Sequence, residues 1–229
     1  MDYGKYKTIV SFMEECMKGN KNSCLHTHRV VNYALQILET EPSATAEVVI
    51  IAALLHDIGC HEKRSGNKGK AYHAKVGSEK SYTFLIENGY TEDIARHIAD
   101  CILTHSLNSA LSPETLEAKI VFDADKLDLT GAVGTFRAIL SSTLAGEPLY
   151  LLDEEGIPLS GRKKEGPSLL QNYQQQLKKL PRLLHTAKAQ KIATKQQKTM
   201  DCYFKELKRE IAKNHKNGSR VVAQYCREE

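Results

Sequence analysis

The 229-residue sequence has no tryptophan and contains only six prolines and 14 glycines. This composition differs from that of fibrous or low-complexity chains, and the 41% of hydrophobic residues is enough for a packed core. The longest nearly apolar run, Val48 to Leu55, is much shorter than a membrane-spanning helix. Residues 1–19 carry charges throughout, so no signal peptide is expected there. A cytoplasmic globular protein without a membrane partner is the resulting expectation.

The six cysteines are scattered, and none of them forms a C-x-x-C pair. Zinc-ribbon and thioredoxin-type motifs are therefore excluded, and free thiols in a reducing compartment are the simplest interpretation. The net charge of +4 is too small to indicate nucleic-acid binding by itself, so no nucleic-acid partner is predicted. A small anionic substrate fits such a charge equally well. The sequence gives no signal for an oligomeric state.

Apolar residues follow a helical period along most of the chain, and no convincing alternating strand pattern is found. The first four expected helices cover about 4–18, 24–40, 45–57 and 73–88. The next begins at Thr91 and includes His105, and another covers Ser112 to Leu129. A further helix, which contains Gly131 and Gly134, reaches Leu144, and the last covers 168–213 with a break at Pro181. Loops are expected at 61–72 and 146–167, the second with room for a short hairpin. The helix at 45–57 is apolar nearly all round and should be buried.

The predicted fold class is therefore all-α, a bundle of roughly eight helices with the site between them. A single domain is expected over residues 1–213. Its core would span residues 20–145 and its C-terminal helical part residues 168–213. Residues 214–229 would form a polar, frayed tail.

Three short segments carry the residues that suggest chemistry, namely HTHRV, LLHDIG and VFDADKLD. They contribute His26, the adjacent pair His56 and Asp57, and the distant Asp125. Two imidazoles and two carboxylates suit a divalent ion such as Mn, Fe, Co, Ni, Zn or Mg. Adjacent helical residues point about 100° apart, so the pair can reach one ion only near a helix end, where Gly59 places it. Alternatively, the histidine only complements the dipole of that helix end.

The acids of VFDADKLD should have different surroundings if the segment is helical. Asp125 shares a face with Val121 and Phe122, so it should point inward. Asp123 lies on nearly the opposite side and should be solvated. Asp128 is one turn beyond Asp125 and could accept a hydrogen bond from a ligand or from a substrate group.

The order of these motifs resembles the HD superfamily of metal-dependent phosphohydrolases. His26, His56, Asp57 and Asp125 match the four metal ligands of that family. His28 is the alternative first ligand, but the register set by the following Arg-Val favours His26. The segments THSLNS, VFDADKLDLTGAVGTFR and GEPLY, and the tail at 185–207, are similar to one branch of small bacterial nucleotide pyrophosphohydrolases. The resemblance covers about residues 25–210.

Two positions depart from that branch, which usually has an acid where this chain has Ser23 and often has one where it has Cys60. His73 and His105 occupy places where many HD proteins keep further histidines, which hold a second metal or contact phosphate. A satisfied core histidine is the alternative for His105.

Basic groups near these motifs could bind phosphate, and the candidates are Lys63, Lys126 and Arg137. A solvated loop is the alternative for the lysines that follow the His-Asp pair. The resemblance implies that Asp57 or Asp125 orients a water molecule for attack on phosphorus.

The favoured function is hydrolysis of nucleoside triphosphates to monophosphate and pyrophosphate with a divalent ion as cofactor. Phosphomonoesterase or cyclic phosphodiesterase activity on nucleotides is one alternative. A nucleotide-binding regulator without turnover is another.

Overall fold

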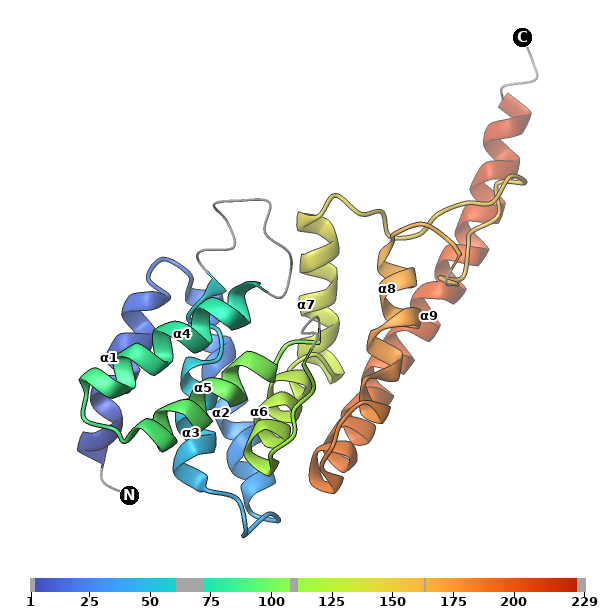
Figure 1. Ribbon diagram of the computed structural model, residues 1–229. Helices are drawn as coiled ribbons and strands as arrows, with labels where there is room; N and C mark the ends of the chain where they lie inside the picture. The colour runs from blue at the N-terminus through green and yellow to red at the C-terminus, as the bar shows by residue number, and fades with distance from the viewer. Residues whose placement is uncertain (1–2, 61–71, 108–110, 163, 226–229) are drawn as a thin grey trace. The chain divides into compact units, whose positions relative to one another are not determined.

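A computed structural model describes residues 3–60, 72–107, 111–162 and 164–225 (Figure 1). Within these ranges the regular elements are helices, and the pairing of extended chain is limited to an isolated antiparallel bridge between Leu152 and Pro158. The all-α prediction is confirmed. No helix of the described residues combines the length and the apolar character that a membrane span needs.

The chain divides into two compact units, which are described separately. The first unit comprises residues 1–128 together with 184–190. Its helices are α1 (Tyr3–Cys16), α2 (Lys21–Leu38), α3 (Ala46–Leu55), α4 (Tyr72–Glu87), α5 (Glu92–Thr104) and α6 (Leu116–Leu127).

Helix α3 is the central helix of the first unit. It packs against α1, α2, α5 and α6, and every residue from Val48 to Leu55 is buried. Burial on all sides is what a helix without a polar face requires, because any exposed face would leave apolar surface in water. The prediction of a buried helix here is confirmed, and its C-terminal end therefore lies inside the unit.

Side-chain caps decide where two helices of the first unit begin. Asn20 accepts a hydrogen bond from the Ser23 amide (3.2 Å), so α2 starts at Lys21, earlier than expected. Thr115 accepts a bond from the Ala118 amide (3.2 Å), so α6 starts at Leu116. The predicted start at Ser112 was therefore wrong, because a threonine hydroxyl three residues later caps the helix.

The second unit comprises residues 129–183 and 191–229. Its elements are α7 (Gly131–Leu144), α8 (Leu169–Gln175), a 3₁₀ helix (Leu177–Arg182) and most of α9 (Ala187–Tyr225). Its buried core consists of Ala138, Leu169, Leu170, Tyr173, Leu177, Leu180, Met200 and Phe204. Met200 and Phe204 lie four residues apart, so they share the face of α9 that enters this core. The helix also continues twelve residues beyond the expected end at 213, so much of the expected frayed tail is helical.

The prediction that Asp123 is solvated was wrong, because the side chain is fully buried. Residues 184–190 cover the side of α6 that would otherwise face water. The Asp123 carboxylate accepts hydrogen bonds from the His185 amide (2.9 Å), the Thr186 amide (2.7 Å) and the Thr186 hydroxyl (2.7 Å). A buried carboxylate thus fixes the returning segment to the first unit.

We expect Asp123→Ala to lower the free energy of unfolding by roughly 2–4 kcal/mol, because it leaves the amide and hydroxyl of buried Thr186, and the His185 amide, without their acceptor. Asp123→Asn should cost less, since the amide oxygen still accepts. Chemical denaturation measures both effects. The control is Asp100→Ala, which removes an exposed carboxylate from α5. Equal stability of the Asp123 and Asp100 variants would contradict the role given to this carboxylate.

Candidate metal centre

His26 lies in the first half of α2 and points into the first unit, where it is 4% exposed. His28, two residues later on the same helix, is exposed. The His26 Nδ1 atom hydrogen-bonds with Asp128 Oδ2 (2.7 Å), which leaves Nε2 as the atom turned toward the other predicted ligands. Of the two histidines considered for the first ligand, only His26 therefore reaches the cluster.

His56 and Asp57 follow directly after the last residue of α3, as the expected helix end requires. His56 is fully buried, and its Nδ1 donates to the Ala53 carbonyl (2.8 Å). The absence of a side chain at Gly59 allows this turn to contact the backbone of α4, because a Cβ atom there would lie 2.2 Å from the His73 carbonyl oxygen. Glycine is thus required for the approach that brings His73 close to the pair.

The four predicted ligands converge on one point. His26 Nε2 lies 3.3 Å from His56 Nε2, 3.2 Å from Asp125 Oδ1 and 3.8 Å from Asp57 Oδ2. His56 Nε2 lies 3.6 Å from Asp57 Oδ2 and 4.0 Å from Asp125 Oδ1. Ligand atoms around one ion at bond lengths of about 2.0–2.2 Å stand roughly 3–4 Å apart. The separations therefore fit a single divalent ion.

The protonation states also suit a metal ion. Burial lowers the pKa of His56 to about 4, so its imidazole is neutral at pH 7. Burial by itself would raise the pKa of Asp57 and of Asp125. The neighbouring His56 holds the pKa of Asp57 well below its usual value, and Lys126 does the same for Asp125. Neutral imidazoles and ionised carboxylates are the forms that bind metals.

A second group of side chains surrounds the other oxygen of Asp57. Asp57 Oδ1 lies 3.7 Å from His73 Nε2, 3.7 Å from His105 Nε2 and 3.2 Å from Cys60 Sγ. The two histidines are 3.3 Å apart through their Nε2 atoms. His105 is buried, and its Nδ1 donates to the Ile102 carbonyl (2.6 Å), so its Nε2 also points at the cluster. His105 is therefore a core histidine that still belongs to the candidate site.

Arg29 is a member of the site that sequence analysis missed. It binds Asp128 through two bonds, from Nε to Oδ1 (2.6 Å) and from Nη2 to Oδ2 (2.9 Å). Asp128 is fully buried and also accepts from His26, as its predicted supporting role requires. The signal for Arg29 was its position three residues after His26, on the same face of α2.

The remaining predicted residues have different locations. Lys126 is buried, donates to Asp125 Oδ2, and lies over the Phe122 ring at 5.3 Å from its centroid. Lys63 lies outside the described residues. Arg137 is on α7 and is described with the second unit. Phosphate binding by these three side chains stays a prediction.

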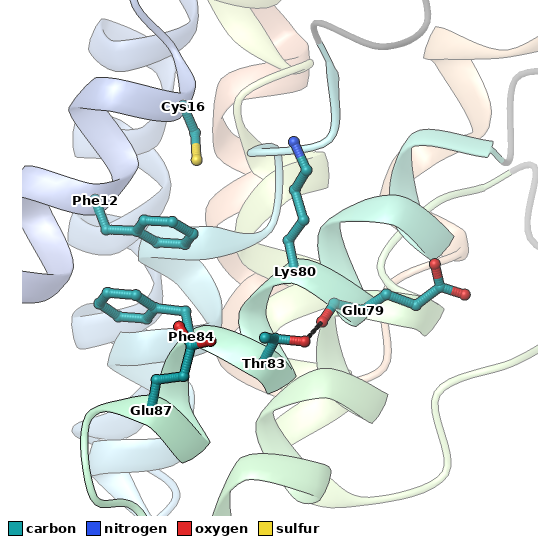
Figure 2. A pocket seen from close by; sticks show the side chains of 7 residues that line it. All are labelled: Phe12, Cys16, Glu79, Lys80, Thr83, Phe84 and Glu87. Atoms are coloured by element: carbon teal, nitrogen blue, oxygen red, sulfur yellow. Dashed lines mark hydrogen bonds between the residues drawn. The ribbon is translucent and has the colours of Figure 1, made fainter.

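A pocket of about 400 Å³ lies between α1 and α4 (Figure 2). The stacked rings of Phe12 and Phe84, with centroids 3.9 Å apart, form part of its wall. The other lining residues are Cys16, Glu79, Lys80, Thr83 and Glu87. None of the metal-cluster residues lines this pocket, so it is not part of the candidate centre.

Comparison with known proteins agrees with the geometry. Residues 25–130 match the HD domain family. The Bacillus subtilis protein YpgQ is 27% identical over 190 residues, which cover 81% of this chain and 82% of that protein. A bifunctional uridylyltransferase/uridylyl-removing enzyme of Vibrio atlanticus is 32% identical over 79 residues, but this chain spans only 8% of its length.

Solved structures have the same fold. The crystal structure of YpgQ in complex with ADP superposes with a TM-score of 0.69 at 25% identity, covering 91% of this chain and 95% of that one. An HD-superfamily hydrolase from Bacillus thuringiensis gives a TM-score of 0.67 at 23% identity, covering 90% and 96% of the two chains.

We expect His26→Ala to lose stoichiometric metal, because it removes one of the two imidazole nitrogens from the proposed ligand set. Metal content after purification and dialysis measures this loss. His28→Ala is the matched control, since it removes an exposed imidazole from the same helix. If His26→Ala retained one ion per chain, the proposed ligand set would be wrong.

The bonds around Asp128 lead to a second expectation. Asp128→Asn should weaken metal binding by about 10–100-fold, because the amide no longer fixes the His26 ring in its metal-binding orientation. Competition with a chromophoric chelator gives the affinity. Asp93→Asn, an exposed change on α5, should leave it unaltered. An unchanged affinity in Asp128→Asn, with a lower melting temperature only, would show that this carboxylate serves packing alone.

Proposed function

We propose that this chain, whose residues 25–130 match the HD domain family, is a metal-dependent phosphohydrolase that cleaves nucleoside triphosphates to monophosphate and pyrophosphate. The observation that carries the proposal is the convergence of two imidazoles and two carboxylates on one point. The nucleotide part is supported by YpgQ, which was solved with ADP and resembles this chain over 91% of its length.

His26, His56, Asp57 and Asp125 would hold the divalent ion in this proposal. Their nitrogen and oxygen atoms accept Mn, Fe, Co, Ni, Zn or Mg. A bound ion of this kind polarises a phosphoryl oxygen and lowers the pKa of a coordinated water. The carboxylates already have low pKa values, so they stay ionised and can accept a hydrogen bond from the attacking water.

Lys126 is the buried cation of the centre, and its ammonium group lies beside Asp125. A phosphate oxygen near Asp125 would meet this positive charge, which stabilises the charge that develops on the phosphoryl group. His73 and His105 would contact the phosphate chain or a second ion, because their Nε2 atoms point toward Asp57. Lys126, His73 and His105 would therefore form an anion-binding site next to the proposed metal ligands.

The choice of the scissile bond depends on how the phosphate tail is held. Lys126 and the predicted phosphate ligand Lys63 together provide more positive charge than one phosphate group needs. If they bind the β- and γ-phosphates, the α-phosphorus is the one presented to the water, and pyrophosphate is the leaving group. The proposal therefore extends to ribonucleoside and deoxyribonucleoside triphosphates.

Product analysis tests this proposal. With Mn²⁺ or Mg²⁺ present, ATP and dATP should yield monophosphate and pyrophosphate in equal amounts, as seen by phosphorus NMR or ion-exchange chromatography. Asp57→Asn, which weakens the metal ligand set, should reduce turnover to background, whereas His28→Ala should not. Release of orthophosphate alone, with monophosphates as the best substrates, would refute the proposal and indicate a phosphomonoesterase. Tight nucleotide binding without any turnover would indicate a regulator.

A further inference from the structure

Cys60 is a thiol in the metal cluster that the function proposed above does not use. It lies three residues after Asp57, at the end of the turn that follows α3, and is partly buried. Its Sγ atom is 3.2 Å from Asp57 Oδ1. The potential ligand atoms of Asp57, Cys60 and His73 all lie within 4.8 Å of one another. The sulfur atom therefore belongs to the second group of donors.

We propose that Cys60 binds as a thiolate to a second metal ion, together with Asp57, His73 and His105, and makes this position selective for thiophilic ions such as Zn²⁺, Co²⁺ or Fe²⁺ over Mg²⁺. Binding replaces the thiol proton, which leaves to solvent, so the step needs no oxidant or reductant. The inference rests on the metal centre of the proposed function but not on its nucleotide substrate.

The separations among Asp57, His73 and His105 suit one ion, and Cys60 lies next to the carboxylate oxygen that they share. Zinc bonds of about 2.0–2.1 Å to nitrogen or oxygen and about 2.3 Å to sulfur give ligand separations of roughly 3.3–3.6 Å in a tetrahedron. The observed separations are 3.2 Å from Asp57 Oδ1 to Cys60 Sγ, 3.3 Å between the two histidines, and 3.7 Å from the carboxylate oxygen to each histidine. Cys60 Sγ also lies within 4.8 Å of the ligand atom of His73.

Asp57 would be shared by two ions. Its Oδ2 faces His26 and His56, whereas its Oδ1 faces His73 and His105. The ring centroids of His56 and His105 are 5.1 Å apart, so the two donor groups are immediate neighbours. Two-metal sites of this kind have ions about 3.5–4 Å apart. One carboxylate with an oxygen for each group is the arrangement that such a pair needs.

Charge balance gives the thiolate a specific role. Two divalent ions bring a charge of +4, while Asp57 and Asp125 supply −2 and the histidines are neutral ligands. A thiolate at Cys60 reduces the net charge of the pair, which lessens the repulsion between two close cations in a buried setting. Because thiolate is a soft ligand, it favours zinc, cobalt or iron, and magnesium gains little from it.

The test uses the metal-free full-length protein and Co²⁺ as the probe. The wild-type chain should bind two Co²⁺ ions, and the ion at the second site should produce a sulfur-to-cobalt charge-transfer band in the near ultraviolet. Cys60→Ser should lose this band and weaken the second ion by about 10-fold or more, while the first ion stays bound. Cys202→Ser, which removes an exposed thiol on α9, should behave as wild type.

A second variant and a spectroscopic measurement distinguish sulfur ligation from a general loss of the second ion. Cys60→Asp restores a negative donor without sulfur, so it should bind two ions but show no charge-transfer band. X-ray absorption of the wild-type zinc form should show a sulfur neighbour at about 2.3 Å. A wild-type protein with one Co²⁺, or with two and no thiolate band, would overturn the inference. Hydrolysis is assayed separately, so failure of the nucleotide proposal with the band intact would leave the inference standing.

Discussion

The structure of the first unit depends on one constraint, the burial of several ionisable side chains at the C-terminal end of an apolar helix. Each buried polar group must find a partner, because an unsatisfied one costs as much as several packed methyl groups. The Nδ1 atoms of His56 and His105 hydrogen-bond to backbone carbonyls, and the Nδ1 atom of His26 hydrogen-bonds to Asp128. The Nε2 atoms that remain all point at Asp57 or Asp125, which is an arrangement that a cation completes.

The same constraint explains the elements around the cluster. Helix α3 can end inside the unit because the turn after it contacts α4 backbone to backbone at Gly59. Arg29 provides the charge that allows Asp128 to be buried without a metal of its own. Lys126 likewise provides a positive charge next to Asp125 Oδ2, which allows that carboxylate to be buried. The packing at Gly59 and the charges of Arg29 and Lys126 thus all stabilise the positions of the candidate metal ligands.

Much of this could be predicted from the sequence, because it depends on short-range periodicity. The apolar run before His56 indicated a buried helix, and helical spacing placed Asp125 inward. Asp123 could not be predicted in the same way. Its burial depends on Thr186, which is 63 residues away and carries no local signal of contact with α6. Arg29 is different, because its spacing from His26 was a local signal, although its partner Asp128 is 99 residues away.

The bonds to Asp123 also bear on how the chain becomes structured during synthesis. The first unit is discontinuous, since the chain leaves it at Asp128 and returns at Leu184. While a ribosome makes the residues between, α6 has no cover on one side, and Asp123 still faces water. The first unit can therefore be completed only after residue 190 has emerged, although its metal-binding side chains are all made by residue 125. The order of synthesis separates the appearance of the ligands from the closing of the core that holds them.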